Sequence, residues 1–160
     1  MPEKSEPEKN WPDLAGRIEA GKHILPVRVY HEDTDFTGLV YHANYLKFCE
    51  RGRSDFVRLA GIGQTEMFAG EGAKEPAAFV VRHMDVDFLK PARMDDVLEI
   101  VTSVDEIGGA VMTLCQEVTR DGVVLVRLRV KIVLIGASGK PRRLGELVRH
   151  GLQAFVNQES

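Results

Sequence analysis

The chain has 160 residues, of which 44% are apolar and 28% charged, with a formal net charge of −3. This length fits one domain around one core, and a small negative charge without a basic block argues against nucleic acid as a partner. No apolar run approaches the roughly 20 residues needed to span a bilayer, so the sequence predicts a protein that is not transmembrane.

The first part of the chain predicts a flexible N-terminal tail over residues 1–22, followed by one domain over residues 23–160. The tail holds Pro2, Pro7 and Pro12 among alternating charges and few large apolar groups. It lacks the apolar segment of a secretory signal. Cys49 and Cys115 lie in apolar periodic segments, which favours free thiols. We therefore expect a cytoplasmic protein without disulfides.

The elements that follow begin with a strand and a helix. Alternating apolar residues predict a strand over residues 24–30, and the polar residues 31–38 predict a loop. Apolar residues at spacings of three and four predict a helix over residues 44–60, with Asn44 as its N-cap. Gly52 inside this helix costs up to about 1 kcal/mol relative to alanine, which favours close packing on a sheet.

Four strands and a short helix complete the chain. The strands are predicted over residues 77–90, 97–105, 110–119 and 123–135, and the helix over residues 144–156. Asp121-Gly122 predicts a tight hairpin between the last two strands. One long helix that buries its apolar face on one curved, mostly antiparallel sheet gives an α+β fold.

The chemistry is concentrated just before the long helix. Asp35 lies in the polar loop and His42 at or near the helix start. Backbone N–H groups at a helix start lack intrahelical partners and can hold an oxyanion. A carboxylate and an imidazole beside such donors predict an acyl-transfer site.

Other interpretations of the same residues stay open at this point. Acidic and amide residues before a helix are often only caps. A metal site built from His31, Asp33, Asp35 and His42 is conceivable, but their spacing matches no specific zinc pattern. The chain has no Gly-x-Ser-x-Gly elbow, phosphate loop or dinucleotide fingerprint, and Cys49 fits the core better than a nucleophile.

Two stretches resemble a known enzyme family. The first runs from Asp33-Thr34-Asp35 through Gly38 and from Val40 to Arg51; the second covers residues 79–83, 86–88, 90–93 and 95–96. Both resemble the YbgC-type acyl-CoA thioesterases, relatives of the 4-hydroxybenzoyl-CoA thioesterases. The resemblance spans roughly residues 25 to 156 in order.

The resemblance implies a hotdog fold, in which a sheet wraps one long helix. It also implies homodimers joined edge to edge, often paired into homotetramers, with active sites between subunits. The family's catalytic aspartate falls on Asp35 and its histidine on His42, where a backbone N–H points at the thioester carbonyl. Four residues before the aspartate a tyrosine is common, and here His31 takes its place.

The implied reaction is the hydrolysis of acyl-CoA or acyl carrier protein thioesters, with Asp35 as general base or nucleophile and no metal or cofactor. His31, Tyr41 and Asn44 are predicted to bind substrate near Asp35. The predicted contacts to the CoA phosphates are Arg82, Lys90 and Arg93, with Arg142 and Arg143 as further candidates. Met67 and Phe68 in the segment 61–76 predict an apolar lining for the acyl group.

Three other functions fit such a fold. They are a hydratase or dehydratase of acyl chains, a non-catalytic acyl-CoA-binding module, and a scaffold in a lipid-synthesis or envelope complex. The run Tyr41-His42-Ala43-Asn44 favours hydrolysis over hydration, and the intact Asp35 argues against a module without activity.

Overall fold

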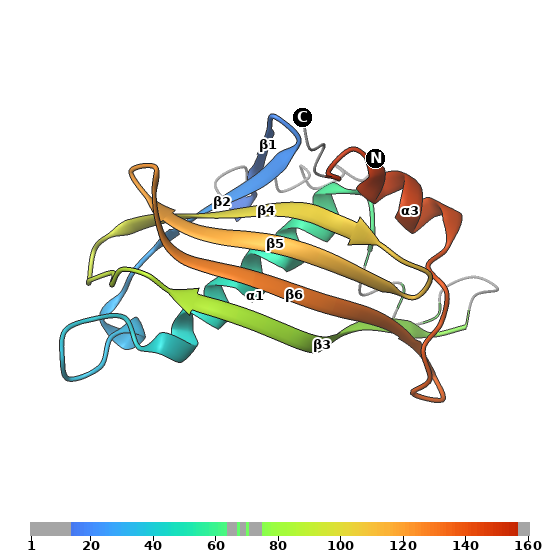
Figure 1. Ribbon diagram of the computed structural model, residues 1–160, viewed down its shortest axis with the longest axis horizontal. Coiled ribbons are helices and arrows are strands. Elements are labelled where there is room, and N and C mark those ends of the chain that lie inside the picture. Colours follow the sequence, from blue (N-terminus) through green and yellow to red (C-terminus); the bar gives the residue numbers. More distant parts are fainter. Residues whose placement is uncertain (1–13, 64–66, 68–69, 71–74, 157–160) are drawn as a thin grey trace, which may run out of the picture.

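The computed structural model describes residues 14–63, 67, 70 and 75–156 (Figure 1). A six-stranded antiparallel sheet has the strand order β1-β2-β4-β5-β6-β3. The strands are β1 (Arg17–Glu19), β2 (Lys22–Arg28), β3 (Ala77–Phe88), β4 (Val97–Ile107), β5 (Val111–Arg120) and β6 (Val123–Gly136). The helices are α1 (His42–Leu59) and α3 (Glu146–Gln153). This confirms the predicted α+β architecture, with β2 to β6 and α1 each within two residues of their predicted bounds.

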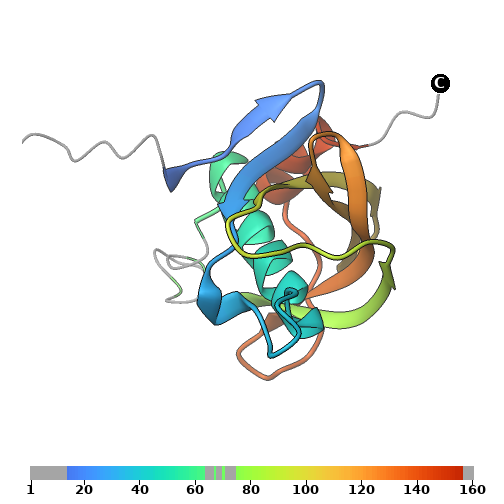
Figure 2. The ribbon, with the colours of Figure 1, turned by 90° about the vertical axis from the view of Figure 1, so that its left-hand side faces the viewer.

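The sheet curves around α1, which lies along its concave face (Figure 2). The helix presents Phe48, Cys49 and Phe56 to the sheet, and all three are fully buried. Gly52 lies between them, and a Cβ atom there would come within 2.7 Å of Cγ2 of Ile100 on β4. The predicted reason for this glycine is therefore confirmed: the helix backbone lies too close to the sheet for a side chain.

The hairpin between β5 and β6 turns at the predicted dipeptide. Asp121 and Gly122 both have positive φ, 50° and 78°. A two-residue turn with positive φ at both positions matches the right-handed twist of the strands it joins. The turn sets the register in which β5 pairs with β6 along its whole length.

The N-terminal boundary differs from the prediction. Residues 17–19 form β1, which pairs with β2, although the segment 1–22 was predicted to be a tail. The backbone N–H of Gly16 also donates to Oδ2 of Asp55, at 2.7 Å. The fold therefore extends at least to Gly16, because a buried carboxylate on α1 binds this segment. Residues 1–13, the rest of the predicted tail, lie outside the described residues.

The second helix closes one end of the barrel-like sheet. Leu152 on α3 and Phe155 just after it are buried, and the Phe155 carbonyl accepts the N–H of Val104. Phe155 stacks edge-on against Phe56 of α1, with ring centroids 4.8 Å apart. Within the described segments, no helix combines the length and the apolar character needed to cross a membrane.

Candidate active site

Asp35 lies at the tip of an exposed loop that precedes α1. The loop closes on itself through a short bridge between Thr34 and Val40, and Asp35 N–H donates to the carbonyl of Leu39. The Oδ1 atom of Asp35 accepts two hydrogen bonds from Thr37, one from the N–H at 2.9 Å and one from the hydroxyl. Oδ2 has no hydrogen-bond partner among the described residues and faces outward on an exposed side chain.

These contacts decide the protonation state of Asp35. The hydroxyl of Thr37 first, and then its N–H, hold the pKa of Asp35 below the usual range, and attraction to His42 acts in the same direction. Asp35 is therefore a carboxylate near neutral pH, with one oxygen fixed and one available.

Asp33 holds the loop against the helix. Its side chain is buried, Oδ2 accepts the N–H of Tyr30 at 2.8 Å, and Oδ1 accepts the side-chain amide of Asn44 at 2.9 Å. The carbonyl of Asp33 accepts the N–H of Tyr41. This residue has a structural role, because it fixes the approach of the chain to α1 from three directions.

His42 is the first residue of α1. Its exposed ring lies between two aromatic rings, with centroids 4.5 Å from Tyr41 and 6.1 Å from Phe88 at the end of β3. The backbone N–H groups of His42 and Ala43 belong to the first turn and have no intrahelical acceptor. The helix start therefore places backbone N–H donors beside the imidazole of His42. The preceding loop adds the carboxylate of Asp35.

Two predictions for the helix start need revision. Tyr41, not Asn44, occupies the N-cap position, and no side chain caps the helix there. Asn44 is buried inside the first turn, where its amide donates to Asp33. A role of Asn44 in direct substrate binding is therefore unsupported by its position, whereas Tyr41 is exposed beside His42.

The predicted basic residues fall in three places. Arg93 belongs to a loop whose backbone bridges Leu39, so it lies next to the Asp35 loop, and exposed Lys90 follows the end of β3. Arg82 is exposed at a bulge in the middle of β3, about 20 Å along the strand from Phe88. Arg142 donates to the carbonyl of Glu75 just before β3 begins, whereas His42 contacts Phe88 at the other end of that strand. Exposed His31 starts the short 3₁₀ turn η2 (His31–Asp33), and its carbonyl accepts the hydroxyl of Thr34.

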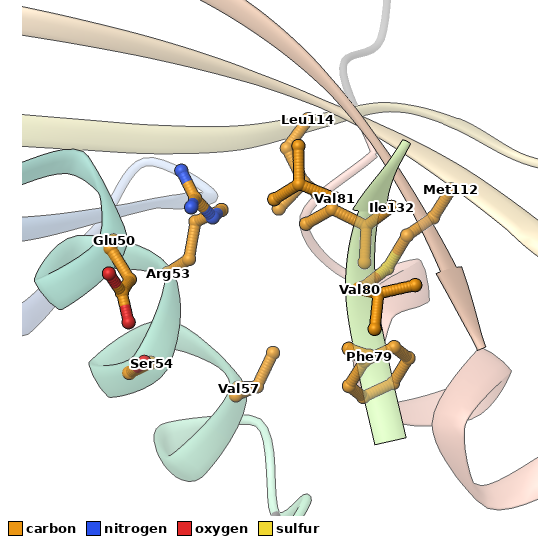
Figure 3. A pocket seen from close by; sticks show the side chains of 10 residues that line it. All are labelled: Glu50, Arg53, Ser54, Val57, Phe79, Val80, Val81, Met112, Leu114 and Ile132. Carbon is orange, nitrogen blue, oxygen red and sulfur yellow. The ribbon is translucent and has the colours of Figure 1, made fainter. Parts of the chain in front are cut away.

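A pocket of about 200 Å³ opens between α1 and the sheet (Figure 3). Its sheet side is apolar and includes Phe79, Val80 and Val81 at the start of β3. Its helix side is formed by Glu50, Arg53, Ser54 and Val57. Met67, predicted to line an acyl pocket, instead packs against the core, and Phe68 lies outside the described residues.

The pocket and the Asp35 loop lie at opposite ends of β3 in one chain. Ser54 follows His42 by twelve residues, about 18 Å along the helix. Arg53 was not predicted as a pocket residue, because it flanks the apolar stripe of the helix and periodicity does not show that this flank faces a pocket. Phe88 was recognised only as part of a matching stretch, and its contact with His42 depends on the fold.

Other reactive groups do not form a competing site. Burial raises the pKa of the Cys49 thiol to about 12, which leaves it a thiol at neutral pH, as expected for a core cysteine. In the part of the chain that the structure describes, no group of three or more His, Cys, Asp or Glu is arranged to hold a metal ion.

Comparison with known proteins identifies the family. Residues 37–127 match the model of the thioesterase superfamily. The chain belongs to the thioesterase superfamily. This match covers more than half of the chain and includes α1 and the strands from β3 to β5 in full. The predicted hotdog fold is thereby confirmed.

The thioesterases most relevant to this chain are YbgC proteins. The acyl-CoA thioesterase YbgC of Haemophilus influenzae is 37% identical over 111 residues, which cover 69% of this chain and 79% of the relative. The acyl-CoA thioester hydrolase YbgC of Escherichia coli is 40% identical over 121 residues, covering 74% and 87%. The predicted resemblance to YbgC-type enzymes is therefore confirmed, and so is the prediction of a thioester-hydrolysing enzyme.

A solved thioesterase structure agrees with the fold. The crystal structure of a probable thioesterase from Bartonella henselae superposes with a TM-score of 0.74 at 44% sequence identity. The superposition covers 78% of this chain and 99% of the other. Nearly the whole of that thioesterase thus corresponds to the domain described above.

Proposed function

We propose that this thioesterase hydrolyses acyl-CoA thioesters with Asp35 as the reacting carboxylate and His42 as its nearest helper. The supporting observation is the arrangement at the start of α1. A carboxylate ionised at neutral pH and anchored through one oxygen stands near unpaired helix N–H groups and an exposed imidazole. Acyl transfer needs these three components: a base or nucleophile, donors for an oxyanion, and a group that can exchange protons.

Two routes use Asp35 in chemically balanced steps. In the first, Oδ2 attacks the carbonyl carbon, the C–S bond breaks, the thiolate leaves and takes a proton, and water then hydrolyses the mixed anhydride. In the second, Oδ2 takes a proton from a water molecule, which attacks the same carbon as the thiolate leaves. In both, the N–H groups of His42 and Ala43 hold the developing oxyanion, while His42 can protonate the thiolate.

The active site is completed by a second copy of the chain. β3 is a twelve-residue edge strand, and Val81, Phe88 and the following Leu89 are each about half exposed. A long edge strand with unpaired backbone groups favours pairing with another strand. Centre-to-centre antiparallel pairing of two β3 strands sets the pocket of one copy beside His42 and Phe88 of the other. The acyl group then enters that pocket while its thioester lies at the helix start.

The remaining assignments follow from this arrangement. Arg93 beside the Asp35 loop and Lys90 after the end of β3 contact the CoA phosphates, and Arg82 lies at the centre of the paired strands. Tyr41 and His31 border the thioester. Acyl carrier protein is a second donor of the acyl group. Two homodimers pair into a homotetramer. The two free thiols favour a cytoplasmic location.

Thiol release from a panel of acyl-CoAs tests the proposal. Asp35→Asn removes the charge and the basicity without changing the shape, and we expect kcat to fall at least about 100-fold. The matched control is Glu32→Gln, because Glu32 is an exposed carboxylate in the same segment. A folded Asp35→Asn protein that keeps wild-type turnover would remove Asp35 from the mechanism.

A further inference from the structure

Arg53 gives the pocket one cationic wall. Its side chain is half-buried and reaches from α1 toward the sheet (Figure 3). The guanidinium donates one hydrogen bond from Nη1 to Oε1 of Gln116, at 3.0 Å. Apart from Glu50 and Ser54, the other side chains of the pocket are apolar. A guanidinium facing such walls is unusual, because polar donors are seldom buried without several acceptors.

Gln116 fixes the position of this guanidinium. The side chain is fully buried on β5, and its amide Nε2 donates to the carbonyl of Cys49 at 2.9 Å and to the hydroxyl of Thr102 at 3.0 Å. Because Nε2 gives both of its hydrogens to these two oxygens, the amide is held with Oε1 toward Arg53. The network therefore orients Arg53 and leaves most of its five N–H donors for another partner.

Among the residues that the structure describes, no ion pair matches the charge of Arg53. Among the described residues, no carboxylate lies within 4 Å of its nitrogens, although several other arginines form such pairs. Burial lowers the pKa of Arg53 from its usual value, as expected for a cation that has lost part of its hydration. Glu50, the other charged residue of the pocket, is exposed, so water weakens its effect on a bound anion.

We propose that Arg53 makes the pocket selective for acyl groups that end in a carboxylate, the acyl groups of short dicarboxylic acids. This inference rests on the proposed function, since it assigns the acyl group of that reaction to this pocket. A carboxylate at the chain end offers two oxygens to the planar guanidinium fork, the strongest pairing available to arginine. An acyl chain that ends in a methyl group offers the guanidinium no hydrogen-bond acceptor.

The size of the pocket agrees with a short chain. Its volume is about 200 Å³, and an engineered apolar cavity of about 150 Å³ in another protein holds one benzene molecule. A chain of a few methylene groups with a terminal carboxylate occupies comparable space. The methylene groups would contact Val57 and Phe79 while the carboxylate meets Arg53.

The test compares glutaryl-CoA with pentanoyl-CoA, which share a five-carbon chain and differ at its end. We expect the wild-type enzyme to give a kcat/KM about 10-fold higher with glutaryl-CoA, and Arg53→Leu to abolish this ratio, in keeping with the loss of a charge-assisted hydrogen bond. Arg53→Lys should keep part of the preference. Arg51→Gln, two residues away on the exposed face of α1, should keep all of it.

Arg53→Leu leaves Oε1 of Gln116 without its donor, and this loss can cause misfolding. A second variant therefore accompanies it in the test. Glu50→Gln changes an exposed side chain and removes the negative charge at the pocket, so the preference for glutaryl-CoA should rise modestly, because water already weakens the repulsion between Glu50 and a bound carboxylate. An unchanged ratio in folded Arg53→Leu, or in both Arg53→Lys and Glu50→Gln, overturns the proposal.

Binding separates failure of this inference from failure of the proposed function. Non-hydrolysable thioether analogues of the two CoA esters are titrated calorimetrically into wild type and the Arg53 variants. Absence of turnover on every ester contradicts the proposed function, whereas equal affinity for the two analogues contradicts the role of Arg53. Tighter binding of the glutaryl analogue, lost in the variants, supports that role independently of turnover.

Discussion

At the scale of single residues, Asp35 owes its reactive form to Thr37, two positions further along the chain. The Thr37 hydroxyl and N–H stabilise the carboxylate, which is why the pKa of Asp35 lies below its usual range. Asp35 stays ionised until the pH falls through this lowered pKa. Activity that depends on the carboxylate should therefore persist well into the acidic range.

Thr37→Val tests this dependence. Removing the hydroxyl removes the largest cause of the lowered pKa, so the pKa of Asp35 rises toward its ordinary value. The acidic limb of the pH profile of kcat/KM should move to higher pH, while activity near neutral pH changes less. Thr37→Ser keeps a hydroxyl and should keep the wild-type profile. An acidic limb that does not move in Thr37→Val would show that another group controls it.

The sequence predicted the residues of this loop better than their interactions. Asp35 and His42 followed from their place before a helix together with the family resemblance. Asn44 was assigned as a cap, because amides before a helix usually cap it, but the buried carboxylate of Asp33 binds that amide from eleven residues away. Arg53 was not predicted as a site residue, since periodicity cannot show which flank of a helix faces a pocket.

At the scale of elements, α1 organises the fold through a buried histidine–carboxylate hydrogen bond as well as through its apolar face. His23 of β2 and Asp55 of α1 are both buried, with Nε2 of the histidine 2.7 Å from Oδ2 of the carboxylate. The same Oδ2 accepts the N–H of Gly16. A single carboxylate thus joins the helix, an inner strand and the segment leading to β1. No local pattern predicts this contact, which explains why β1 was assigned to a tail.

Asp55→Ala should weaken this connection strongly. Removing one partner of a buried pair leaves the other without compensation, so the free energy of unfolding should fall by about 3 kcal/mol or more. Chemical denaturation measures this loss, and hydrogen exchange should show earlier opening of the Gly16 amide. Asp105→Ala breaks a more exposed pair with Arg129 and should cost less than about 1 kcal/mol. Equal losses in the two variants would contradict the role given to Asp55.

At the scale of the whole molecule, one chain holds two halves of a site that do not meet. The Asp35 loop and His42 lie at the Phe88 end of β3, whereas the pocket lies at its Ala77 end. The order of the elements along the chain, the long helix and the hairpin at Asp121-Gly122 were predicted from hydrophobic periodicity and turn residues, because those signals are local. The separation of loop and pocket was not, because it depends on the length and course of β3 within the folded sheet.

In the proposed dimer, Asp35 of one copy acts on an acyl group held in the pocket of the other. Mixed dimers purified with two different tags test this arrangement. Asp35→Asn lacks the carboxylate, and Ser54→Trp fills the pocket on α1. Each variant alone should be inactive as a homodimer, once circular dichroism shows that both are folded.

A mixed dimer of Asp35→Asn with Ser54→Trp contains one intact combination of carboxylate and pocket, and the account predicts about half of wild-type turnover, one active site of the two. The control dimer pairs a wild-type chain with a chain carrying both changes, and it should be inactive because neither site is complete. The reverse pattern, an inactive mixed dimer and a half-active control, would place carboxylate and pocket within one chain and contradict the account.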